Sequence, residues 1–289
     1  MNGMPDASTG ASGSLSPPRR RRRAPRLSGT LVALLSTVLV FGVLGWAIAT
    51  SPGWPRVQSQ FFDGEVFAAS FPDIAKAFVV NIRIFLVAQV LILAFALVLA
   101  VMRSLPGPAF FPFRLIAVAY IDFFRGVPSV VIIYIVGLGV PGLRLPGVTN
   151  DPFILGVIVL VVVWSAYVAE VYRAGIESVH PSQEAAARSL GLSRFQGLRY
   201  VVLPQAVRRV IPPLLNDFIG LQKDSALVSF IGVIEVFRRT QIEQSGGFDF
   251  TPYLACALLF LLITIPMTRF VDWLAARDRK RQFAGNRAR

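Results

Sequence analysis

An apolar stretch runs from residue 206 to residue 236 and is interrupted by two prolines, an asparagine and several charged residues. These residues are Pro212, Pro213, Asn216, Asp217, Lys223, Asp224 and Glu235. Such groups can bind a small charged molecule without covalent chemistry. One straight helix over this stretch would be about 46 Å long, which exceeds a hydrocarbon core of about 30 Å. A charge in the middle of a bilayer costs roughly 2.5–3.5 kcal/mol on insertion scales, so these side chains cannot face lipid.

We therefore predict a broken helix with Lys223, Asp224 and Ser225 at the break. Asp224 or Ser225 is expected to cap a second half that begins at Ala226. In one interpretation, Lys223 and Asp224 form an ion pair that only holds the break together. In the other, these residues contact a bound molecule, because broken helices line cavities and their free N–H groups attract carboxylates. The two interpretations are compatible.

The chain has few of the residue types that covalent catalysis and metal binding require. It has one cysteine, Cys256, inside an apolar run, and one histidine, His180, before Pro181. A disulfide framework, a Cys/His zinc cluster and an iron–sulfur site are therefore excluded within the chain. A single histidine in a polar loop also leaves no Ser–His or His–Glu constellation for an intramembrane enzyme. We expect His180 to be an ordinary loop residue.

Two further charge pairs occur near the ends of apolar stretches. Asp122 and Arg125 are three residues apart on one helical face, and a Gly-Val-Pro sequence at 126–128 then interrupts the helix. We expect this pair to neutralise itself and the break to redirect the rest of the stretch. Glu170 and Arg173 repeat the spacing.

Residues 182–204, here called the knob, form a polar segment rich in alanine and arginine between two apolar stretches. Ser182 suits the N-cap of a short helix, and Gly191 permits the positive φ that ends one. Ser193 can then start a second short helix. Small side chains at such a corner allow close approach of a partner, and the arginines can meet its acidic rim. The alternative is an amphipathic connector that rests on lipid headgroups.

The composition is that of a membrane protein. Of 289 residues, 54% are hydrophobic and 16% are charged, with a mean hydropathy of +0.62, whereas soluble domains carry about 25% charged residues. The net charge of +13 gathers at two tails and in short loops, without a basic face interleaved with aromatic residues. We therefore expect anionic lipid headgroups of the bilayer, and no nucleic acid, as the partner of these charges.

The N-terminal region divides into two parts. Residues 1–28 are rich in Gly, Ser and Pro and end in an arginine run, which predicts a disordered tail. The apolar run at 29–50 is long enough to span a bilayer and long for the ~7–15 residues of a signal peptide's apolar region. We therefore predict a retained transmembrane span at 29–50 rather than a cleaved signal. A second basic tail is expected at 277–289.

Six apolar stretches are long enough to cross a membrane, near residues 29–50, 77–102, 115–140, 153–174, 206–236 and 252–275. Each must be helical, because lipid offers no partners to backbone N–H and C=O groups. The predicted fold class is therefore all-α, a polytopic membrane protein with about six transmembrane helices. Arginine and lysine concentrate in the tails and in alternate loops, so the positive-inside rule places both termini and residues 175–209 in the cytoplasm.

The knob resembles the cytoplasmic coupling-loop motif of ATP-binding cassette importer permeases, which reads Glu-Ala-Ala, three residues, Gly, nine residues, an aliphatic residue, one residue and Leu-Pro. Here SQEAAARSLGLSRFQGLRYVVLP matches it at Ala186, Ala187, Gly191, Leu203 and Pro204. The run from AARSLGL to VIEV, and YIDFFRGVP at 120–128, are similar to the polar amino-acid branch of that family. The likeness covers roughly residues 73–276, so residues 29–50 look like an addition to a five-helix importer core.

One residue departs from the motif. The family's glutamate would fall at position 185, where this chain has Ala185, and Glu184 comes one residue earlier. About 100° of helix rotation separates the two positions. The resemblance therefore implies a docking role for the knob, with Glu184 as its acid, without implying that Glu184 makes the contact of the family's glutamate.

The resemblance implies a permease subunit of an importer that moves a polar amino acid across a bacterial-type cell membrane into the cytoplasm. A separate ATPase subunit would dock at the coupling loop 175–205 and bind the ATP, because this chain lacks the G-x-x-x-x-G-K-[ST] phosphate loop and would be no enzyme. An extracytoplasmic amino-acid-binding protein and a second permease subunit, identical or paralogous, would complete the complex.

Within such a permease, the residues expected to line the translocation path are Asn216, Lys223, Asp224 and Ser225. The alternative function is an ion-coupled secondary amino-acid transporter. That class usually shows an inverted repeat with two matching broken helices, and the knob would be surplus to it.

Overall fold

The structure is a computed structural model that describes residues 29–287, with side chains described up to residue 277. The predicted disordered tail 1–28 lies outside the described residues. The described part of the chain is almost entirely helical and contains no strand, as predicted. The chain divides into two compact units at residue 55.

Helix α1 (Gly29–Ala49) makes up most of the described part of the first unit. It is apolar on all sides, and none of its residues is buried. Its 21 residues give a length of about 31 Å, which matches the hydrocarbon thickness of a bilayer. The helix agrees in length and composition with a membrane span at 29–50.

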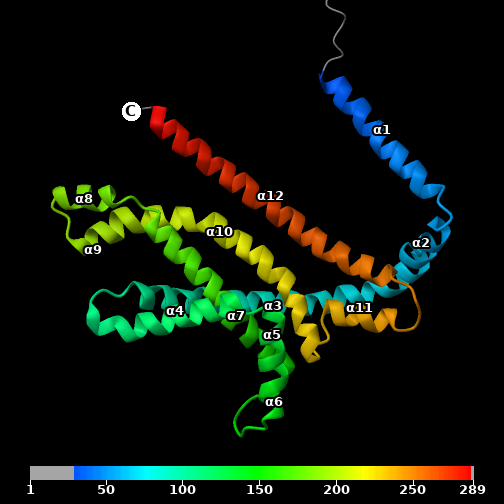
Figure 1. Cartoon of the computed structure of the whole chain (residues 1–289), viewed down its shortest axis with the longest axis horizontal. Coiled ribbons are helices and arrows are strands. Elements are labelled where there is room, and N and C mark those ends of the chain that lie inside the picture. The colour runs from blue at the N-terminus through cyan, green and yellow to red at the C-terminus, as the bar shows by residue number, and fades with distance from the viewer. Residues whose placement is uncertain (1–28, 288–289) are drawn as a thin grey trace, which may run out of the picture. The chain divides into compact units, whose positions relative to one another are not determined.

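Short helix α2 (Trp54–Phe61) crosses the boundary between the units, and the second unit contains the remaining elements (Figure 1). In chain order they are α3 (Gly64–Ser104), η1 (Pro108–Phe110), α4 (Phe111–Gly126), α5 (Ser129–Tyr134), η2 (Ile135–Gly139), α6 (Val140–Gly142), α7 (Pro152–Glu177), α8 (Pro181–Ser189), α9 (Arg194–Gly197), η3 (Leu198–Val202), α10 (Leu203–Asp224), η4 (Ser225–Ile231), α11 (Val236–Gln244) and α12 (Thr251–Arg287).

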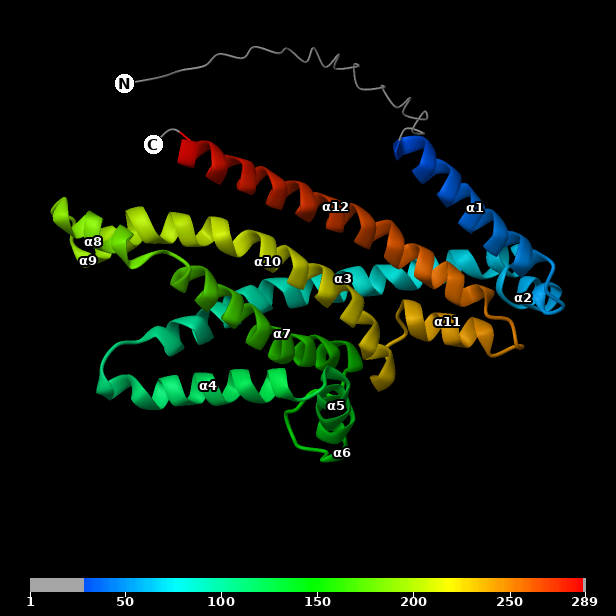
Figure 2. The same ribbon diagram turned by 45° about the horizontal axis from the view of Figure 1, so that its top comes forward.

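Helices α3 and α7 form the centre of the second unit. They pack along each other, and α7 also contacts α4 and α10 (Figures 1 and 2). The main core consists of aliphatic side chains from these elements, among them Ile84, Ile92, Ile121, Leu160 and Leu221. A second, smaller core joins the start of α3 to α11 and α12, and it contains Ile74, Phe78, Val236, Ala255 and Cys256. These contacts fix the polar elements described below.

The Gly-Val-Pro sequence at 126–128 breaks the helix as predicted. The segments Pro108–Gly126 and Ser129–Gly142 meet at an angle of 104°. Pro128 cannot donate a helical hydrogen bond, and it restricts Val127 to the extended conformation that the structure shows, with φ −97° and ψ 132°. The turn therefore follows from local sequence.

Within residues 29–287, four helices are long and apolar enough to cross a membrane, and the bent pair around residues 126–128 would make a fifth. Helix α10 is not among them because it carries several charges. The count of about six crossings and the cytoplasmic position of the termini stay predictions. The predicted basic tail at 277–289 continues α12 as a helix up to Arg287.

Candidate functional site

The knob folds as two short helices at a corner, as predicted, but its first cap differs from the prediction. Helix α8 begins at Pro181, and its N-cap is His180, whose Nδ1 accepts a hydrogen bond from the Ser182 N–H at 3.2 Å. The prediction of Ser182 as N-cap was therefore wrong. Proline is favoured at the first helical position, which moves the start of the helix toward the N-terminus. His180 is a capping residue and not an ordinary loop residue.

Gly191 forms the corner. Its φ of +82° lies in the left-handed region, where a glycine carries no steric penalty. The Leu192 N–H donates to the Ala187 carbonyl at 3.1 Å, and the Gly191 N–H donates to the Arg188 carbonyl at 2.9 Å. This pair of bonds is a Schellman motif, which satisfies the last carbonyls of α8. The predicted helix end at Gly191 is confirmed.

Ser193 starts the second helix, as predicted. Its Oγ accepts from the Gln196 N–H at 3.2 Å, while Gln196 Oε1 accepts from the Ser193 N–H at 2.9 Å. This reciprocal pair is a capping box. The helix continues from α9 through a π-helical turn, η3, directly into α10, so the knob joins α10 without a loop.

The small residues of the knob have different surroundings. Ala187 is buried, with 3% of its surface exposed. It packs against Gly197 of α9, because a methyl group added to Gly197 would lie 3.5 Å from the Ala187 Cβ. Ala186 is exposed. Glu184 forms an ion pair with Arg188 at 2.9 Å on the surface of α8. Ala187 therefore holds the two helices together, whereas Ala186 is available to a partner.

Leu203 and Pro204 begin α10 and are both exposed. Two hydrogen bonds attach this part of the chain to its surroundings. Arg209 donates from Nη1 to the Ser178 carbonyl at the end of α7. Gln205 donates from Nε2 to Gln183 Oε1 in α8, at 3.4 Å.

The predicted break near residue 224 is present, but its continuation differs from the prediction. Helix α10 ends at Asp224, and the next seven residues form the 3-10 helix η4. No side chain caps η4, so the expected cap by Asp224 or Ser225 was wrong. The capped helix is α11, where Glu235 accepts from the Phe237 N–H at 3.0 Å and from the Arg238 N–H at 2.8 Å.

Asn81 of α3 holds the break in place. Its Nδ2 donates to Glu235 Oε2 at 2.8 Å and to Ser225 Oγ at 3.1 Å, and its Oδ1 accepts from the Val236 N–H at 2.9 Å. All four residues are buried. Sequence reasoning missed Asn81. The available signal was an asparagine within an otherwise apolar stretch, where a buried amide needs partners.

The four residues predicted to line a path have different environments. Asn216 and Lys223 are exposed and Asp224 is half-buried, whereas Ser225 is fully buried. Ser225 Oγ accepts from Asn81 and donates to the Gln222 carbonyl at 2.6 Å. Among the described residues, no salt bridge joins Lys223 to Asp224. The hydrogen bonds of Ser225 therefore hold the break together, whereas the side chain of Lys223 is free to contact a ligand.

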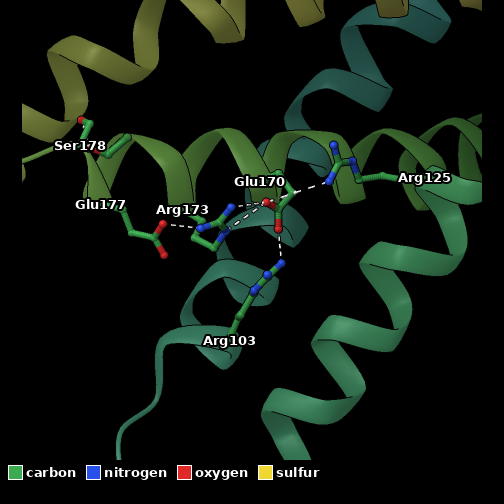
Figure 3. A network of polar contacts seen from close by, with 7 residues as sticks. Arg103, Arg125, Glu170, Arg173, Glu177 and Ser178 are labelled. Carbon is green, nitrogen blue, oxygen red and sulfur yellow. Dashed lines mark hydrogen bonds and ion pairs between the residues drawn. The ribbon is translucent and has the colours of Figure 1, made fainter.

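A cluster of ion pairs surrounds Glu170 of α7 (Figure 3). Glu170 contacts Arg103 of α3, and its Oε2 lies 2.8 Å from Arg173 Nη2. Arg125 Nη1 of α4 is 4.0 Å from the same oxygen, and Arg173 also pairs with Glu177. The predicted Glu170–Arg173 pair is confirmed.

The predicted Asp122–Arg125 pair was wrong. Arg125 turns to Glu170 and lies over the Tyr167 ring, 5.7 Å from its centroid. Asp122 is exposed and has no polar partner among the described residues. Glu170 has a side chain only 15% exposed. A shielded carboxylate attracts a guanidinium more strongly than a hydrated one does, which accounts for the different partner.

The fold and these groups define an all-helical membrane protein with a broken polar helix and an exposed helical corner. Residues 108–280 match the family described as "Binding-protein-dependent transport system inner membrane component". The chain belongs to this family, and it is a protein of the cell membrane.

Individual relatives agree with this family. The chain is 36% identical over 202 residues to the probable glutamine ABC transporter permease protein GlnM of Bacillus subtilis, covering 68% of this chain and 90% of the relative. It is 35% identical over 163 residues to the glutamine transport system permease protein GlnP of Escherichia coli, covering 56% and 74%. A solved structure of an amino acid ABC transporter with histidines matches with a TM-score of 0.68 and 31% identity, covering 74% of this chain and 98% of that one.

Proposed function

We propose that this chain is the permease subunit of an ATP-binding cassette importer that carries a polar amino acid across the cell membrane into the cytoplasm. The observation that carries the proposal is the α8–α9 corner, with an exposed Ala186 and a left-handed Gly191 at the positions of the family motif. The names of the relatives, which are amino-acid and glutamine permeases, support the substrate class.

The partners of such a permease follow from its family. Membership implies an ATPase subunit, a binding protein and a second permease subunit. We propose that the importer domain covers residues 73–276, that the second permease subunit is identical or paralogous, and that the tails and the coupling loop 175–205 are cytoplasmic. In this orientation the ATPase binds the nucleotide and contacts Ala186, and the binding protein delivers the amino acid on the opposite side.

The continuity of the helices suggests how ATP binding at the knob is coupled to movement of the amino acid. The knob continues through η3 into α10 without a loop, and α10 ends at the break held by Asn81. A displacement of the knob on ATP binding would therefore move α10 as one body. Its far end carries Lys223 and Asp224, which we propose contact the amino acid together with Asn216 near the middle of the path.

The decisive experiment is uptake by proteoliposomes that contain this chain, its second permease subunit, its ATPase and its binding protein. We expect uptake of labelled L-glutamine to require ATP on the knob side and the binding protein, and to persist with ionophores that collapse H⁺ and Na⁺ gradients. Uptake driven by an ion gradient in liposomes that contain this chain alone would instead establish the secondary transporter. No observation in the structure or the comparisons favours that alternative.

A further inference from the structure

A groove of about 580 Å³ lies between α4, α7 and α10. Residues 209, 213 and 217 line it from α10, and Tyr167, Glu170 and Ala174 line it from α7. Their spacings of three and four residues place each set on one helical face. The volume lies in the range of about 300–1,000 Å³ of small-molecule sites.

Asp217 is the unsatisfied acid of this groove. Neither of its carboxylate oxygens has a hydrogen-bond or ion-pair partner among the described residues, and Oδ2 is inaccessible to solvent. A carboxylate without a donor is costly away from water. A cationic donor in the groove would remove that cost.

Two arginines line the groove, and Arg209 already donates to the Ser178 carbonyl, which leaves Arg125 as the cation for a ligand carboxylate. Arg103 and Arg173 hydrogen-bond to Glu170, whereas Arg125 remains 4.0 Å away. Figure 3 shows Arg125 reaching Glu170 from the side opposite Arg173. Three arginines face two carboxylates, those of Glu170 and Glu177, so the cluster has one positive charge in excess. The side chain of Arg125 is 44% exposed and can bind another carboxylate.

Pro213 removes one hydrogen bond from α10 beside the groove. A proline has no N–H, so Pro213 cannot donate to the Arg209 carbonyl one turn earlier. Pro213 itself lines the groove. The α10 wall of the groove therefore offers the carboxylate of Asp217 as an acceptor, while the α4 wall offers the guanidinium of Arg125.

We propose that this groove binds the zwitterionic head of the transported amino acid before its release, with the ammonium at Asp217 and the carboxylate at Arg125. The inference rests on the proposed function and adds a second binding position, separate from Lys223 and Asp224 at the break. The small side chain of Ala174 on the α7 wall leaves room for the ligand.

The test measures binding to the full-length chain purified with its ATPase, without nucleotide and without binding protein. The probes are L-glutamine, N-acetyl-L-glutamine, which lacks the ammonium, and L-glutamine α-amide, which lacks the carboxylate. The wild type should bind L-glutamine at least about tenfold more tightly than either analogue, because each loses one charge-assisted hydrogen bond. Asp217→Asn should abolish the preference for L-glutamine over the N-acetyl compound and keep the preference over the amide. Arg125→Gln should abolish the preference over the amide and keep the preference over the N-acetyl compound.

Two matched variants serve as controls. Asp122→Asn removes an exposed carboxylate from α4, and Arg83→Gln removes an exposed guanidinium from α3, both outside the groove. Both should keep the wild-type preferences. The groove is ruled out as the binding position if Asp217→Asn and Arg125→Gln also keep them, or if the wild type binds no glutamine while still importing it. Absence of ATP-driven import in the wild type would instead reject the proposed function itself.

Discussion

Gly175 of α7 lies so close to α10 that a methyl group on it would come within 1.9 Å of Val210 Cγ2. The two helices can therefore cross only because Gly175 has no side chain. We predict that Gly175→Ala lowers the free energy of unfolding by about 1–3 kcal/mol, since overpacking forces the helices apart. Thermal unfolding of the purified protein in detergent would show this as a lower Tm.

A second substitution at Val210 should restore the stability that Gly175→Ala removes. Val210→Ala removes the methyl group that clashes, so the double variant Gly175→Ala with Val210→Ala should regain most of the lost Tm. Gly142→Ala is the matched control, because no atom lies within 4 Å of the added methyl group. Equal losses in the single and double variants would contradict the proposed contact.

The corner at Gly191 should tolerate asparagine better than alanine. Alanine in the left-handed region costs about 1–2 kcal/mol, whereas asparagine visits it more readily. We expect Gly191→Ala to weaken stimulation of ATP hydrolysis by the binding protein and Gly191→Asn to retain most of it. The measurement is ATPase activity of the reconstituted complex. If both variants behaved alike, the left-handed conformation would not be what the coupling requires.

Because Ala186 is exposed, a substitution there should change binding of the ATPase and not the stability of the fold. Ala186→Glu should leave Tm unchanged and weaken association with the ATPase, because the exposed alanine is replaced by a larger charged group. Ala185→Glu places the same group one position earlier, where the family's acid stands, and should be tolerated. Ala187→Leu should lower Tm, because Ala187 is buried in the corner. Co-purification and unfolding curves separate these outcomes, and equal ATPase binding by the three variants would contradict the proposed surface.

Lys223 and Asp224 should affect transport rather than assembly. We expect Lys223→Gln and Asp224→Asn each to raise the KM for uptake by about tenfold, as loss of one charge-assisted contact would. Arg83→Gln serves as the control for loss of an exposed charge. Unchanged KM and rate for both variants in a normally assembled complex would mean that the break has a structural role only.

The bonds of Asn81 predict a loss of stability. Asn81→Ala leaves Glu235, Ser225 and the Val236 N–H without their partner, and we expect a loss of about 1–3 kcal/mol in the free energy of unfolding. Asn216→Ala is the comparison, because Asn216 is exposed and bonded to nothing among the described residues. Similar Tm values for the two variants would show that the buried network contributes little.

Local signals in the sequence predicted the knob and both helix breaks. Gly191 and Ser193 act through their own conformation and caps, and Pro128 acts through its missing N–H, so neighbouring residues suffice to place them. The break after Lys223 follows from charges that lipid does not accept. These features need no knowledge of the tertiary fold.

The errors arose where distant residues compete for a partner. Arg125 had a nearby acid in Asp122, yet it approaches Glu170, which is better shielded from water. Asn81 was overlooked because its partners come from η4 and α11 and cannot be seen from its own helix. The groove likewise depends on how α4, α7 and α10 pack, which periodicity alone does not specify.

The partners of Asn81 also set an order of events during synthesis. They lie 144, 154 and 155 residues further along the chain, so they leave the ribosome long after α3 does. Until then the nascent protein carries an amide that lipid cannot solvate. The hydrogen bonds of this amide are therefore completed only after the start of α11 has been made. A chain truncated before residue 225 would contain all of α3 and none of these three partners.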